Sequence, residues 1–104
     1  MSESGLAVSR TVIRELVRLA AFEVPGVVRV AWAGPPWRRL GAGRPVAVRV
    51  RNGAVDARVV IVARPGQALA PLAHDVRRAV TAAIERLLGL SVGDVTVRID
   101  GVGA

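Results

Sequence analysis

The sequence has no cysteine, no lysine and no tyrosine, and its aromatic residues are one phenylalanine and two tryptophans. The absence of cysteine excludes disulfides, thiolate nucleophiles and the common cysteine-based zinc sites. With so few aromatics, the expected strands lack the base-stacking residues of an RNA-binding sheet. Charges interrupt every apolar stretch well short of the roughly 18 residues that a membrane span needs. Because the first residues show no secretory signal pattern either, we expect a cytoplasmic protein.

Residues that could carry out catalysis are also scarce. The single histidine, His74, stands beside Asp75 but has no serine or second histidine at a useful spacing, so a surface histidine is the favoured interpretation. The acidic residues form none of the usual metal-binding motifs, and no glycine-rich segment opens a helix as a phosphate loop would. The sequence therefore predicts no enzyme, no bound metal and no cofactor.

Positive charge is abundant, and it comes only from arginine. The formal net charge is +7 and the isoelectric point is near 11.8. Such a charge favours contact with polyanions, whether nucleic acid, anionic lipid or an acidic protein. Charge alone does not distinguish among these three classes of partner.

A β-hairpin is the clearest structural signal. Residues 46–51 and 54–63 alternate in character on either side of Asn52-Gly53, the dipeptide most typical of a two-residue hairpin turn. Counting outward from this turn pairs Arg49 with Asp56. One face then collects apolar residues, namely Val46, Val48, Val50, Val55, Ala57, Val59, Ile61 and Ala63. The other face carries Ala47, Arg49, Arg51, Asp56 and Arg58.

Helical periodicity appears on both sides of the hairpin. Residues 10–24 form one apolar stripe after the N-cap residue Ser9, and Val12, Leu19 and Phe22 widen it. Residues 68–88 form a second helix that ends at Gly89. Further strands are expected at 27–33 and 95–99, a loop rich in proline and glycine at 34–45, and a flexible end at 1–8.

These elements predict one domain from residue 9 to 104, in the order α-β-β-β-α-β. Each helix has a single apolar stripe, so both should pack on one face of the sheet. The fold class is α/β (α+β), a two-layer sandwich with a four-stranded mixed sheet. We expect the first three strands to form an antiparallel meander and the last strand to join in parallel.

The helix-free face of the sheet is the predicted assembly surface. Val60 and Val62 have no helix to cover them there, and arginines border them, as in an interface with an apolar centre and a polar rim. The alternative is that the 34–45 loop covers both valines within the monomer. Trp37, Arg38 and Arg39 in that loop either contact a partner or fold back on the core. The candidate interaction residues are Val60, Val62, Arg49, Arg51, Arg58, Trp37, Arg38 and Arg39.

Over residues 8–102 the chain resembles the bacterial alkaline shock protein family of envelope stress response proteins. The segments that carry this resemblance are EVPGV at 23–27, the V-x-V-x-V-x-x-G-x-V hairpin from residue 46, and Gly89-Leu90 followed by VTV at 95–97 and Gly101-Val102. The chain departs from the family at Pro65, where an aromatic is usual, and at Arg77, where glutamine is common. The resemblance implies a non-enzymatic scaffold at the inner face of the membrane that self-associates and binds a membrane-anchored partner. Sequence-independent nucleic-acid binding through arginines is the alternative.

Overall fold

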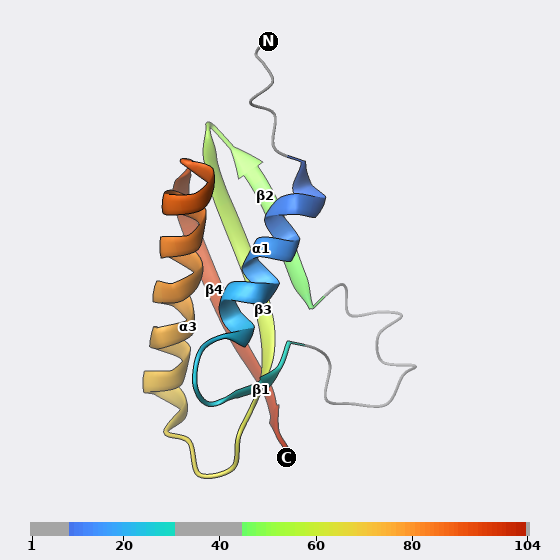
Figure 1. Cartoon of the computed structure of the whole chain (residues 1–104), viewed down its shortest axis with the longest axis vertical. Coiled ribbons are helices and arrows are strands. Elements are labelled where there is room, and N and C mark those ends of the chain that lie inside the picture. Colours follow the sequence, from blue (N-terminus) through green and yellow to red (C-terminus); the bar gives the residue numbers. More distant parts are fainter. Residues whose placement is uncertain (1–8, 31–44, 104) are drawn as a thin grey trace.

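The computed structural model describes residues 9–30 and 45–103, and it has two layers. Helices α1 (Arg10–Phe22) and α3 (Leu69–Ala83) lie side by side over one face of a four-stranded sheet (Figure 1). This arrangement confirms the predicted fold class. The flexible end expected at residues 1–8 and the loop at 34–45, apart from Pro45, lie outside the described residues.

Helix α1 begins where the sequence predicts. The Ser9 hydroxyl accepts a hydrogen bond from the backbone N–H of Val12 at 3.2 Å, which satisfies one of the free donors of the first turn. The helix buries Ile13, Val17 and Ala21. These residues recur every four positions, so they form the stripe that packs on the sheet.

The hairpin has the predicted register. Strand β2 (Val46–Arg51) pairs with β3 (Ala54–Ala63) through six antiparallel partners, including Arg49 with Asp56. Asn52 and Gly53 have φ angles of 51° and 79°, the left-handed values that this turn type requires.

The position of β1 (Val27–Arg29) corrects the predicted meander. This strand does not pair with β2 but with β3, antiparallel, where Val27 lies opposite Ala63. The physical reason is the unequal length of the hairpin strands. Strand β2 is 6 residues long and β3 is 10, so the last residues of β3 remain open on that edge and β1 pairs with them.

Strand β4 (Ser91–Val102) pairs with β3 in parallel, as predicted, and makes the sheet mixed. It is longer than the expected strand at 95–99. The chain reaches it from α3 through the π-helical turn η2 (Ile84–Leu88), and Gly89 ends the helix with a φ of 67°. No described helix is both long and apolar enough to cross a membrane.

The hydrophobic core lies between the two helices and the sheet. Val59 and Ile61 of β3 are fully buried there against residues of α1 and α3. The helix layer does not cover the whole apolar face of the hairpin, because Val48 is only half-buried and Val50 is 47% exposed. The buried apolar residues of this core are Ile13, Val17, Ala21, Val24, Val27, Val46, Val55, Ala57, Val59, Ile61, Ala63, Leu72, Val76, Val80 and Ile84.

Candidate interaction surface

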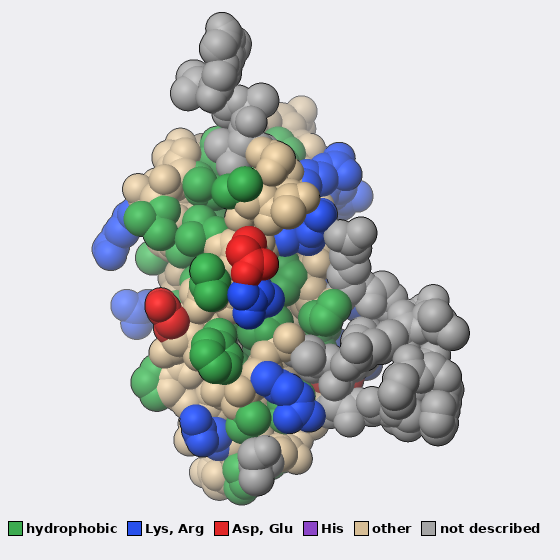
Figure 2. All heavy atoms as spheres, turned by 45° about the vertical axis from the view of Figure 1, so that its right-hand side comes forward, with side chains coloured by type: hydrophobic (Ala, Val, Ile, Leu, Met, Phe, Trp, Pro, Cys, Tyr) green, Lys and Arg blue, Asp and Glu red, His purple; other side chains and the backbone are tan. Residues whose placement is uncertain are grey.

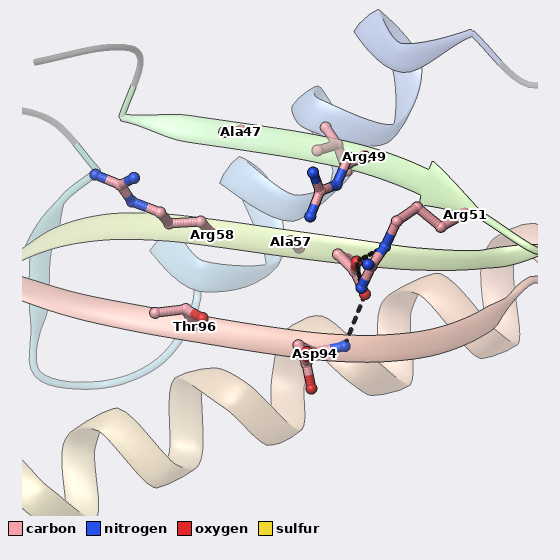
Figure 3. A pocket seen from close by; sticks show the side chains of 9 residues that line it. Ala47, Arg49, Arg51, Ala57, Arg58, Asp94 and Thr96 are labelled. Atoms are coloured by element: carbon pink, nitrogen blue, oxygen red, sulfur yellow. Dashed lines mark hydrogen bonds and ion pairs between the residues drawn. The ribbon is translucent and has the colours of Figure 1, made fainter.

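The three arginines predicted for the rim, Arg49, Arg51 and Arg58, come together on the helix-free face of the sheet. Arg49 and Arg51 are two residues apart on β2, so both point to the same side, and Arg58 lies on the neighbouring strand opposite Ala47. They line a shallow depression of about 440 Å³ together with residues of β3 and β4 (Figure 3). We call this region the arginine depression.

Asp56 joins three strands at the floor of the arginine depression. Its Oδ2 accepts a hydrogen bond from Nε of Arg51 at 2.9 Å and forms an ion pair with Nη2 of the same side chain at 2.8 Å. Its Oδ1 accepts a hydrogen bond at 2.9 Å from the backbone N–H of Asp94 on β4 (Figure 3). One carboxylate therefore ties β2, β3 and β4 together, and its side chain is only 17% exposed.

These contacts favour the charged form of Asp56. The hydrogen bond from the Asp94 backbone holds the pKa of the Asp56 carboxyl below its ordinary value, and the hydrogen bond and positive charge of Arg51 lower this pKa further. Gly93 makes this geometry possible, because a Cβ at that position would collide with Oδ1 of Asp56. The roles of Gly93 and Asp94 could not be predicted, because the register shift between β3 and β4 that aligns them is not visible in sequence.

Arg49 and Arg58 are the members of the arginine depression that remain available for binding. Both are exposed, and neither takes part in a hydrogen bond or an ion pair with another described residue. A guanidinium group has several donors in a fixed plane and binds a carboxylate or phosphate through two parallel hydrogen bonds. This surface therefore has the chemistry to bind an anionic group.

The expectation that Val60 and Val62 are exposed is wrong. Their exposed fractions are 0% and 1%. Neither belongs to the core between helices and sheet, because the alternation of β3 directs them to the opposite face from Val59 and Ile61. The unbroken apolar run VVIVA at 59–63 is the sequence signal for a strand buried on both faces. An interaction role for these valines stays a prediction. Because both side chains are buried, a partner could contact them only after a conformational change.

Three of the predicted interaction residues belong to the loop expected at 34–45. Trp37, Arg38 and Arg39 lie outside the described residues. His74 lies on the exposed side of α3 in a separate depression of about 350 Å³, together with Arg77 and Arg78. In residues 9–30 and 45–103, no group of three His, Asp or Glu side chains is placed to hold a metal ion.

Comparison with known proteins gives a family and a fold. The model of the alkaline shock protein 23 family, described as having a cell envelope-related function, matches residues 2–104. No curated protein matches the chain.

Solved structures of the MamM CTD share the fold. Its copper form has a TM-score of 0.57 and 20% identity over 88% of this chain and 85% of that one. A zinc form of a variant of the same domain has a TM-score of 0.59 and 19% identity over 90% of this chain and 87% of that one. At such identities the likeness shows the arrangement of helices and strands alone.

Proposed function

The chain belongs to the alkaline shock protein 23 family, which has a cell envelope-related function, and from this membership we propose that it is a non-enzymatic scaffold of the cell envelope. In this proposal the protein lies at the inner face of the membrane, associates with further copies of itself and binds a membrane-anchored protein. The family match over residues 2–104 is the observation that carries the proposal.

We propose the arginine depression as the surface that binds the partner. Asp56 already neutralises Arg51, whereas Arg49 and Arg58 present two exposed guanidinium groups on a rigid sheet. A partner with clustered carboxylates would pair with both of them. Because these arginines are exposed, their contribution should weaken as salt concentration rises.

Affinity capture from the envelope fraction of the source cells, together with light scattering of the purified protein, tests this proposal. The wild-type protein should capture a membrane-anchored protein and scatter as an oligomer. The double variant Arg49→Gln with Arg58→Gln should lose most of the captured partner. The matched variant Arg64→Gln, which changes an exposed arginine just after the end of β3 and outside the arginine depression, should retain it. The proposal is wrong if the wild type is a monomer that captures no membrane protein.

Nucleic-acid binding is the second candidate, and the same two exposed arginines and the net charge of +7 favour it. A basic domain binds polyanions at low salt whatever its purpose, so the salt dependence decides between the two candidates. We expect affinity for duplex DNA and for RNA to disappear near physiological salt. Submicromolar binding that persists there would favour nucleic acid over an envelope scaffold.

A further inference from the structure

Strand β2 leaves one edge of the sheet open. Among the described residues it pairs only with β3, so no strand lies on its other side. The N–H of Val60 on β3 donates to the carbonyl oxygen of Pro45 at 2.7 Å, and hydrogen-bonded pairs recur at every second residue of an antiparallel ladder. The odd-numbered residues of β2 therefore bond to β3. The N–H and C=O groups of Val46, Val48 and Val50 point away from β3, toward the open edge.

The two faces of this edge differ in character, because side chains alternate along a strand. On the helix-free face, Arg49 is exposed and has no hydrogen bond or ion pair with another described residue. On the helix side, Val48 is half-buried and Val50 is 47% exposed. A strand added at this edge would therefore meet positive charge on one face and apolar side chains on the other.

Further arginines lie around the open edge. Arg58 stands one strand further in, opposite the small residue Ala47 of β2, so its long side chain can reach over β2. A second depression of about 200 Å³ lies at the start of β2, where Arg14, Glu15 and Arg18 of α1 line it, and Glu15 is already paired with Arg18. Figure 2, which brings the side of β2 forward, shows arginine side chains next to hydrophobic ones. The surroundings of the edge thus favour carboxylates.

We propose that the open edge of β2 accepts an extended segment of the partner protein as an additional strand. The segment alternates acidic and apolar residues. Its carboxylates pair with Arg49 and Arg58, and its apolar side chains pack on the helix side of the edge. Its backbone bonds to the free N–H and C=O groups of β2, a binding mode known as β-augmentation. This inference rests on the proposed role of the arginine depression in partner binding and adds how the partner binds there.

Other occupants fit this edge less well. Strand β2 carries two arginines and no acidic residue, so the β2 edges of two copies would place like charges together. The other outer strand, β4, packs against α3, and Nε of Arg77 on that helix already donates to the carbonyl oxygen of Val95 at 3.0 Å. Nucleic acid offers phosphates to the arginines but no peptide groups to the strand edge. An acidic, extended peptide satisfies both the charges and the backbone.

Synthetic peptides test the proposal with the purified full chain. One short peptide, the alternating peptide, alternates glutamate and valine, and the block peptide has the same composition with all glutamates before all valines. We expect the alternating peptide to bind about tenfold more tightly by fluorescence polarisation, because only it presents its carboxylates on one face of a strand.

N-methylated peptides test the backbone contact. In one series the valine amides of the alternating peptide are methylated, and in the other the glutamate amides. The N–H groups of a strand point alternately to its two sides, so only one series removes donors that face β2. We expect that series to lose binding about tenfold and the other series to retain most of it.

Variants of β2 locate the contact. Val48→Pro removes an N–H that points to the open edge and not into the ladder with β3, so the strand can keep its pairing. It should weaken binding of the alternating peptide about tenfold, whereas the matched variant Val48→Thr, which keeps the N–H, should bind nearly as well as the wild type. Circular dichroism checks the fold of each variant. Hydrogen exchange gives a measurement without any variant, because binding should slow exchange of the Val48 and Val50 amides.

Three outcomes would overturn strand addition. The alternating and block peptides bind equally, the two N-methylated series lose equal affinity, or duplex DNA binds more tightly than the alternating peptide at physiological salt. Failure of the arginine depression itself is a separate result. It would appear as unchanged partner capture by Arg49→Gln with Arg58→Gln, whatever the peptides do.

Discussion

On the helix-free face of the sheet, Val60 and Val62 are buried while Arg49 and Arg58 lie in solvent. On the helix layer the distribution is reversed, since apolar side chains of α1 remain about half exposed and Arg18 is paired with Glu15. The first face has the composition of a polar binding surface on a rigid support, whereas the second leaves apolar side chains in solvent. Apolar character in the sequence is therefore no guide to which face is free to bind.

Aspartate scanning should show this contrast most strongly. Val60→Asp places a charge at a position with 0% exposure and should lower the free energy of unfolding by about 3 kcal/mol or more. Leu19→Asp, at 45% exposure, should cost less than about 1 kcal/mol. Urea denaturation of both variants measures the difference. Equal losses would mean that the two faces do not differ in burial as described.

Gly93→Ala should have the next largest effect. The added Cβ collides with Oδ1 of Asp56, so the carboxylate must leave its bonds to Arg51 and Asp94 or the strands must shift. We expect a loss of about 1–3 kcal/mol. Gly53→Ala tests backbone strain without a steric collision. There is open space around that glycine, so only its positive φ is unfavourable for alanine. A neutral Gly93→Ala variant would contradict the role of Asp56 as a junction.

Acid should lower the free energy of unfolding by protonating the same carboxylate, that of Asp56. The pKa of Asp56 is lowered in the folded state, so the unfolded chain takes up a proton first as pH falls. The stability that this group contributes is therefore present above about pH 4 and is lost progressively below it. Asp56→Asn should be less stable at neutral pH and lose less stability on acidification. If the free energy of unfolding changed with pH in the same way for the wild type and Asp56→Asn, Asp56 would not contribute to the acid sensitivity.

Removing the exposed arginines should change stability least. Arg49→Gln with Arg58→Gln breaks no hydrogen bond or ion pair with another described residue, so we expect a change within about 0.5 kcal/mol. Thermal unfolding compares the variant with the wild type. A large loss of stability would show that these arginines support the fold and would remove the case for a binding surface.

The sequence predicted most of the fold because local signals agreed. Asn52-Gly53 set the hairpin register, and the helical stripes placed both helices on one face. The position of β1 was missed because strand pairing depends on which edge remains open. The burial of Val60 and Val62 was missed because alternation shows which face of the strand a side chain is on. It does not show whether another part of the molecule covers that face.

The candidate site was only partly predictable. Alternation placed the three arginines on one face, and the hairpin register placed Arg49 opposite Asp56. The ion pair formed with Arg51 instead, and the hydrogen bond from Asp94 depended on a register shift between parallel strands. The exposure of part of α1 was not predictable either. Val12, Leu19 and Phe22 were expected to widen the stripe that packs on the sheet, but they are 50%, 45% and 51% exposed. Their helical spacing was visible in sequence. Their exposure was not, because α1 has more apolar surface than the sheet can cover.

The most direct test of two faces with separate roles compares two double variants. Arg49→Gln with Arg58→Gln changes the helix-free face, and Leu19→Gln with Phe22→Gln changes the helix layer. Each variant is assayed for partner capture from the envelope fraction and for binding of the alternating peptide. We predict that the arginine variant loses most of both activities and that the helix variant keeps both. If both variants lost both activities, or if both variants kept both activities, the two faces would not have separate roles.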